Sequence, residues 1–187
     1  MGTTVLIIIF SVIIIGVAGI AALIFLRKRK TKKLRTRFGP EYARAVEESG
    51  GRRQGEAGLQ EREKRVEGFA IRPLAPSDRE RCVASWRRVQ AQFVDDPKSS
   101  VTEADRVLGD VMSTRGYSVS DFEQRSADIS VNHPRVVENY RAAHEIAVRH
   151  ARGEASTEDL RQAMIHYRTL FDELVGEPEV ARAKAAS

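Results

Sequence analysis

The chain has 187 residues, with 31 Lys and Arg against 26 Asp and Glu and a formal net charge of +5 at pH 7. Eight of these cations and no acid lie in residues 27–37, and residues 1–26 carry no charged side chain, so residues 38–187 have a net charge of −3. This pattern argues against a nucleic-acid-binding domain, because the positive charge belongs to one short segment. The single cysteine, Cys82, excludes an intramolecular disulfide and suits a reducing compartment.

Residues 5–26, VLIIIFSVIIIGVAGIAALIFL, are twenty-two residues without a charge. As a helix they would be about 33 Å long, enough for the roughly 30 Å hydrocarbon core of a bilayer. A cleavable signal peptide fits less well, because it has a basic segment before an apolar core of about 7–15 residues. We therefore expect residues 1–26 to form an uncleaved transmembrane anchor. Small residues at Gly16, Gly19 and Ala22 also leave a homodimer of such helices open.

A basic juxtamembrane collar, residues 27–37, follows the apolar run directly. Its eight cations are Arg27, Lys28, Arg29, Lys30, Lys32, Lys33, Arg35 and Arg37. Because loops rich in Lys and Arg stay in the cytoplasm, the collar predicts a single-pass protein of the inner cell membrane, with the N-terminus outside and the C-terminal domain in the cytoplasm. A second role is attraction of anionic lipid head groups, worth about 1 kcal/mol per cation.

Residues 38–76 are expected to form a polar, partly helical tether. Pro40 suits the first turn of a short helix that runs to Glu48, and Ser49-Gly50-Gly51 ends it. Residues 56–67 are dense in charge and predict a solvated helix. The two prolines in residues 72–76, RPLAP, then interrupt the helical pattern.

Residues 77–176 predict a cytoplasmic bundle of about five helices, which makes the expected fold all-α. Apolar residues recur at helical spacing in its segments, and Gly116 and Gly176 mark two helix ends. Serines followed three residues later by an acid predict helix starts as capping boxes, at Ser77, Ser100, Ser120 and Ser156. Pro134 suits the first position of a further helix. Residues 177–187 are expected to be a flexible tail.

The sequence shows no motif for catalysis, a cofactor or a metal: no phosphate loop, Rossmann glycine pattern, CxxC pair or nucleophile elbow. His144-Glu145 lacks the second histidine of a zinc-protease motif, because Val148 stands at that position. Tyr140, His144 and Tyr167 place polar tips on otherwise apolar helix stripes. Two interpretations stay open: the three line a small pocket between the last two long helices, or their tips form hydrogen bonds at the edge of the core.

Three segments resemble a group of uncharacterised bacterial single-pass membrane-anchored helical proteins. They are residues 35–46, RTRFGPEYARAV, residues 89–95, VQAQFVD, and residues 122–125, FEQR. The resemblance covers nearly all of the chain after the anchor. It implies a bacterial inner-membrane setting and transfers no activity and no site residue.

Three functions are hypotheses at this point. The first is a non-catalytic, membrane-tethered cytoplasmic module that binds an unknown protein partner. The second is a regulator that responds to a lipid or small molecule through a pocket between helices. In this hypothesis the collar recognises anionic lipid head groups. The third is an undetected enzyme, which would need a cavity lined by two or more of Tyr140, His144, Tyr167 and nearby acids.

Overall fold

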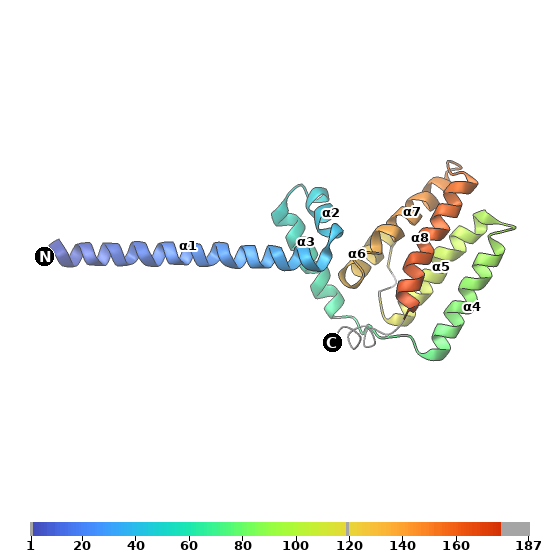
Figure 1. The fold of residues 1–187 in the computed structure, drawn as a ribbon, viewed down its shortest axis with the longest axis horizontal. Helices are drawn as coiled ribbons and strands as arrows, with labels where there is room; N and C mark the ends of the chain where they lie inside the picture. Colours follow the sequence, from blue (N-terminus) through green and yellow to red (C-terminus); the bar gives the residue numbers. More distant parts are fainter. Residues whose placement is uncertain (1, 119, 177–187) are drawn as a thin grey trace. The chain divides into compact units, whose positions relative to one another are not determined.

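The computed structural model describes the backbone of residues 2–118 and 120–176, and the side chains of these residues except 2–15 and 17. This part of the chain contains eight α-helices and no strand, which confirms the all-α prediction (Figure 1). The helices are α1 (Gly2–Phe38), α2 (Pro40–Glu48), α3 (Arg52–Glu67), α4 (Pro76–Gln92), α5 (Pro97–Arg115), α6 (Phe122–Asn132), α7 (Val137–Ala151) and α8 (Thr157–Val175). They form two compact units, Met1–Glu56 and Ala57–Ser187.

Helix α1 runs without interruption through 37 residues, so the apolar run and the collar belong to one helix. Among the residues that the structure describes, no helix is both long and apolar enough to cross a membrane. Most of the predicted anchor, residues 1–15 and Val17, lies outside the residues whose side chains are described.

The first unit turns back on itself after α1. Gly39 adopts φ 49°, and Pro40 follows at the first turn of α2, where its missing N–H costs no helical hydrogen bond. Helix α2 covers the residues predicted for it, and the turn at residues 49–51 leads into α3. There Gly55 lies so close to α2 that a Cβ atom at this position would be 2.7 Å from the Cα of Val46. The absence of a side chain therefore allows α2 and α3 to touch.

Replacing Gly55 with alanine is expected to destabilise the first unit by about 1–3 kcal/mol, because an added methyl group would force the two backbones apart. The matched control is Gly58→Ala, on the same helix, where a Cβ atom meets nothing within 4 Å. That change should stabilise α3 by about 0.5–1 kcal/mol through its higher helix propensity. Hydrogen–deuterium exchange of residues 40–56 measures both effects, and equal exchange in the two variants would contradict the close approach.

The second unit is a bundle in which α8 packs against α4, α5 and α7, α4 also packs against α5, and α6 packs against α7. Its core contains Trp86 from α4 and Phe171 from α8, with ring centroids 4.6 Å apart and planes inclined by 13°. Such aromatic pairs add roughly 0.5–1.5 kcal/mol to the free energy of burial. The five helices α4–α8 confirm the number predicted for residues 77–176.

The first two predicted helix starts in the bundle are wrong. Helix α4 begins at Pro76 instead of Ser77, because proline has the fixed φ of a first helical turn. Helix α5 begins at Pro97, so Ser100 lies inside the helix instead of at its cap. There the Asp96 carboxylate accepts a hydrogen bond from a backbone N–H of the first turn, at 3.1 Å, and so serves as the cap.

Two further starts are also displaced, and one is confirmed. Asp121, not Ser120, caps α6, with its carboxylate accepting a backbone N–H at 2.8 Å. Helix α7 begins at Val137, three residues after Pro134. The box at Ser156 forms both of its reciprocal hydrogen bonds at the start of α8. Aspartate caps as well as serine does, so the spacing rule cannot distinguish neighbouring candidates.

The end of α5 holds the segment before α4 in place. Gly116 ends α5 in the left-handed conformation, φ 94°, as predicted, and a Cβ atom here would clash with the carbonyl oxygen of Ala70. The N–H of Arg72 donates to the carbonyl of Arg115 at 2.9 Å. The Arg115 guanidinium in turn donates to the carbonyl of Leu174 at 3.0 Å and so satisfies a free carbonyl at the end of α8.

Candidate functional site

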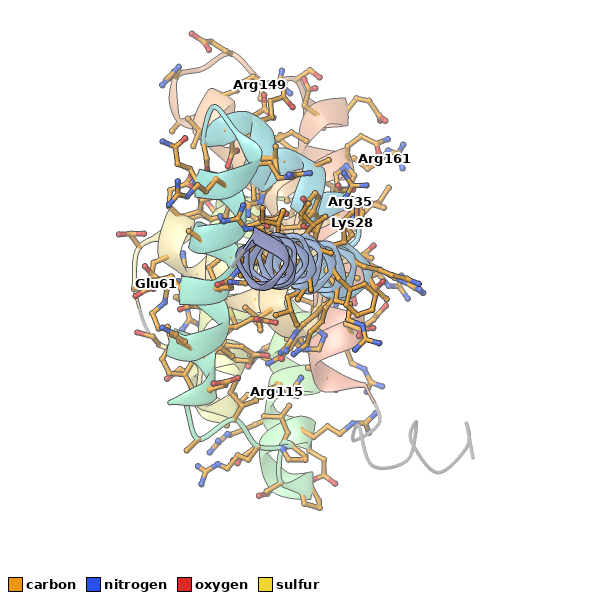
Figure 2. The ribbon with its side chains drawn as sticks, turned by 90° about the vertical axis from the view of Figure 1, so that its left-hand side faces the viewer. Lys28, Arg35, Glu61, Arg115, Arg149 and Arg161 are labelled. Carbon is orange, nitrogen blue, oxygen red and sulfur yellow. The ribbon has the colours of Figure 1, made fainter. Side chains whose placement is uncertain are left out.

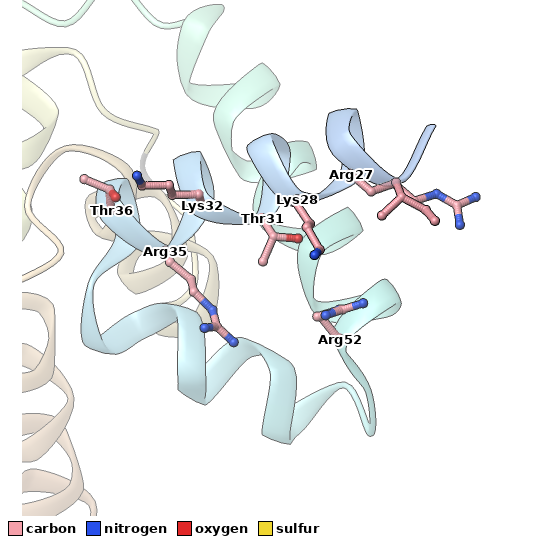
Figure 3. Close-up of a pocket in the computed structure, with 8 residues that line it drawn as sticks. Arg27, Lys28, Thr31, Lys32, Arg35, Thr36 and Arg52 are labelled. Carbon is pink, nitrogen blue, oxygen red and sulfur yellow. The ribbon is translucent and has the colours of Figure 1, made fainter. Parts of the chain in front are cut away.

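A pocket of about 460 Å³ lies in the first unit, on the collar part of α1 and the start of α3 (Figure 3). Five cations line it: Arg27, Lys28, Lys32, Arg35 and Arg52. The rest of the lining is Thr31, Thr36 and, toward the apolar run, Ile24. No carboxylate contributes to this lining, so the pocket is built from hydrogen-bond donors and positive charge.

Helical spacing explains why half of the collar gathers here. The α1 residues of the lining stand at positions 24, 27, 28, 31, 32, 35 and 36, which recur every three to four residues and share one face. Viewed along α1, Lys28 and Arg35 project from the same side of the helix (Figure 2). The other four collar cations, Arg29, Lys30, Lys33 and Arg37, do not line the pocket. At about 100° per residue Lys30, Lys33 and Arg37 point to the opposite side, whereas the Arg29 guanidinium lies over the Phe25 ring at 4.5 Å.

Arg52 completes the pocket from a distance of sixteen or more residues in sequence. The turn at residues 49–51 brings the start of α3 back beside α1, and Figure 3 shows Arg52 facing Lys28 and Thr31. No motif in the sequence points to Arg52, Thr31 or Thr36. The periodicity of the collar was a usable signal for the two threonines, whereas Arg52 depends on how the chain turns.

Glu56 fixes the wall of the pocket. One of its carboxylate oxygens accepts hydrogen bonds from the hydroxyls of Thr31 and Tyr42, each at 2.8 Å, and lies 4.0 Å from Nε of Arg52. These three contacts join α1, α2 and α3 at one largely buried carboxylate. The pKa of Tyr42 is raised mainly by burial and, to a smaller extent, by the hydrogen bond to Glu56. The Arg35 guanidinium lies over the Tyr42 ring at 5.1 Å, which orients it by a cation–π contact.

Three of the five cations of the pocket are available to an anion. In the part of the chain that the structure describes, Arg27, Lys28 and Lys32 form no ion pair with a carboxylate, in contrast to Arg44, which pairs with Glu48 at 2.7 Å. Guanidinium forks bind phosphate and carboxylate oxygens in a bidentate manner, and ammonium groups add point charge. The arrangement can therefore bind an anionic group.

The structure also brings together the predicted residues Tyr140, His144 and Tyr167. Tyr140 and Tyr167 are fully buried, with ring centroids 6.3 Å apart. Phe122 joins them to the histidine, since its ring stacks on His144 at 3.5 Å and lies 4.9 Å from Tyr140. Desolvation by burial lowers the pKa of His144. The three side chains thus form part of an aromatic cluster between α6, α7 and α8.

The tyrosine hydroxyls of this cluster lie near an ion pair formed by Asp105 and Arg125. The Tyr140 and Tyr167 hydroxyls are buried near the Asp105 carboxylate, but neither forms a hydrogen bond of regular geometry. Burial, and then the nearby Asp105 carboxylate, raise the pKa of both phenols far above the ordinary value, so both stay protonated. Asp105 lies 3.5 Å from Nη2 of Arg125, and the other carboxylate oxygen of Asp105 is buried without a partner.

A cavity of about 530 Å³ is lined by Asp105 and other residues of α5 and by Arg125 of α6, but neither tyrosine lines it. That Tyr140, His144 and Tyr167 line a pocket therefore stays a prediction. Within the described residues, no group of three or more His, Cys, Asp or Glu side chains is placed to hold a metal ion. His133 instead lies 3.1 Å from Glu173, and His166 lies 2.8 Å from the side-chain oxygen of Asn139.

Comparisons with protein-family models, with curated proteins and with solved structures found no match to this chain. The resemblance to bacterial membrane-anchored proteins therefore stays a prediction.

Proposed function

We propose that this protein is a single-pass protein of the inner cell membrane that holds a helical bundle at the cytoplasmic face as a module for binding another protein. In this proposal residues 1–26 are the anchor, with the N-terminus outside. The collar, residues 27–37, lies at the lipid surface, and the bundle carries the interaction. The observation that supports it most is that an uncharged run of twenty-two residues passes directly into eight cations.

The continuity of α1 supports this placement of the collar. Because α1 does not break between the run and the collar, Arg27 to Arg37 would rise about 15 Å along one axis. The head-group layer of one leaflet is roughly 5–8 Å deep. The first collar cations would therefore lie among the head groups, and the last ones would lie in the cytoplasm.

The charge distribution supports a bundle that stands clear of the membrane. Residues 38–187 have a net charge of −3, so the bundle gains nothing from an anionic lipid surface. An acidic helical domain on a membrane tether is well suited to meet a second protein in the cytoplasm. The collar then provides the attachment and the bundle provides the recognition.

One fusion tests both parts of the proposal. A proximity-labelling enzyme placed after Ser187 is expected to mark cytoplasmic proteins in cells, because the positive-inside rule places the C-terminal side there. The control fusion carries only residues 1–56 before the enzyme, so it keeps the anchor and the collar but lacks the bundle. Labelling of proteins outside the cytoplasmic compartment would refute the orientation, and identical protein sets from both fusions would refute the role of the bundle.

A further inference from the structure

We propose that the basic pocket binds the phosphate of one phospholipid whose head group carries no ammonium group, with phosphate monoesters bound most strongly. This inference rests on the proposed membrane anchorage, and it assigns to part of the collar a specific ligand instead of a general attraction. The shared chemistry is a phosphate anion, and the lipid is the source that the pocket favours.

The donor set of the pocket matches phosphate. Arg27, Arg35 and Arg52 bring three guanidinium forks, and Lys28 and Lys32 bring two ammonium groups. A phosphate oxygen only accepts hydrogen bonds from such groups, and charge-assisted bonds of this kind are about twice as strong as neutral ones. The volume of about 460 Å³ lies within the roughly 300–1,000 Å³ that small-ligand sites occupy.

The same charge discriminates between head groups. A serine, ethanolamine or choline head group places a positive ammonium a few bonds from the phosphate. In this pocket that ammonium would face five cations with no carboxylate in the lining to receive it. Glu56 contacts two residues of the pocket, Thr31 and Arg52, and one of its oxygens already accepts two hydrogen bonds. Like charges placed together disfavour such a ligand.

The apolar end of the pocket indicates that the phosphate comes from a lipid. Ile24 lines the pocket on the side of the apolar run and is 49 % exposed, next to the exposed side chains of Leu23 and Phe25. From Ile24 to Arg35 the helix rises about 16 Å. The lining therefore changes from apolar to cationic along one helix face, which is the order in which a phospholipid presents its acyl chains and its phosphate.

The first test compares two triple variants of the full chain in detergent micelles. Arg27→Gln/Lys28→Gln/Lys32→Gln removes pocket cations, and Arg29→Gln/Lys30→Gln/Lys33→Gln removes one Arg and two Lys of the collar that do not line the pocket. Native mass spectrometry measures binding of short-chain phosphatidic acid. We expect one saturable lipid per chain, and at least tenfold weaker binding for the first triple than for the second. Equal weakening by both triples would mean general attraction by the collar and would overturn the proposal.

A second pair of variants leaves the collar intact. Arg52→Gln removes a pocket cation, whereas Arg53→Gln changes the neighbouring residue, which does not line the pocket. A lost charge-assisted hydrogen bond predicts roughly tenfold weaker phosphatidic acid binding for Arg52→Gln. Arg53→Gln should change binding less than twofold. The same loss in both variants would contradict a built site.

Two other probes separate the possible sources of phosphate. Phosphatidylserine should bind at least tenfold more weakly than phosphatidic acid, and inorganic phosphate at least a hundredfold more weakly. If inorganic phosphate binds as tightly as the lipid, the occupant is a free anion and the lipid assignment is wrong. Carbonate extraction of cell membranes is a separate readout: release of the unmodified chain would refute the anchorage, while the micelle experiments would still decide whether the pocket recognises phosphate.

Discussion

Replacing Arg65 with methionine is expected to destabilise the bundle by about 3 kcal/mol, because it leaves a buried carboxylate without its cation. Nε of Arg65, in the part of α3 that belongs to the second unit, donates to Oδ1 of Asp128 at 2.8 Å. The Asp128 side chain is only 1 % exposed, and its second oxygen has no hydrogen-bond partner. Gln124 supplies one further hydrogen bond, at 2.8 Å, but no charge.

The measurement is urea unfolding of the full chain in detergent, followed by the fluorescence of Trp86, the single tryptophan and a core residue of the bundle. Asp128→Asn provides the matched change, since it removes the charge and keeps the shape. The double variant Arg65→Met/Asp128→Asn should be no less stable than Asp128→Asn alone. Additive losses would show that the arginine contributes packing and not compensation of the buried charge.

The bundle is also expected to lose stability steeply above about pH 10, where exposed tyrosines ionise. The folded-state pKa values of Tyr140 and Tyr167 are raised, chiefly by burial, so the folded protein keeps two protons that the unfolded chain releases. Their stabilisation is complete below the unfolded pKa and falls as the pH rises toward the folded pKa values. Each tyrosine contributes a slope of about 1.4 kcal/mol per pH unit, so the pair gives nearly 3.

The Tyr140→Phe/Tyr167→Phe variant should flatten this loss in urea titrations between neutral and alkaline pH. At pH 7 its free energy of unfolding is expected to stay within about 1 kcal/mol of the unmodified protein, because neither hydroxyl forms a hydrogen bond of regular geometry to the neighbouring Asp105 carboxylate. Tyr42→Phe, in the first unit, serves as the control and should leave the alkaline slope reported by Trp86 unchanged. An equally steep loss in the double variant would show that other groups govern alkaline unfolding.

The number of helices and their apolar faces were predictable because they depend on local patterns. Five helices in residues 77–176, the helix end at Gly116 and the box at Ser156 follow from periodicity and capping chemistry. Exact helix starts were less predictable. Asp96 and Asp121 stand near the predicted serines and cap at least as well, and Pro76 and Pro97 favour earlier starts.

The association of Tyr140, His144 and Tyr167 was predictable for a similar reason. All three stand on the apolar faces of helices that pack together, so a shared location follows from pattern. Their surroundings were not predictable. Asp105 on α5 and Arg125 on α6 approach the two hydroxyls only because of how those helices pack, and no local rule links positions that far apart in sequence.

The sequence by itself determined an uncharged run of membrane length, a collar of eight cations after it and an all-α pattern in residues 38–176. These properties follow from composition and from the spacing of apolar residues over one or two helix turns. Only the tertiary structure decided which face of the collar lies opposite Arg52, because the turn after α2 and the contacts of Glu56 bring α3 back beside α1. A binding site requires groups to converge in space, and convergence is set by how the chain folds back on itself.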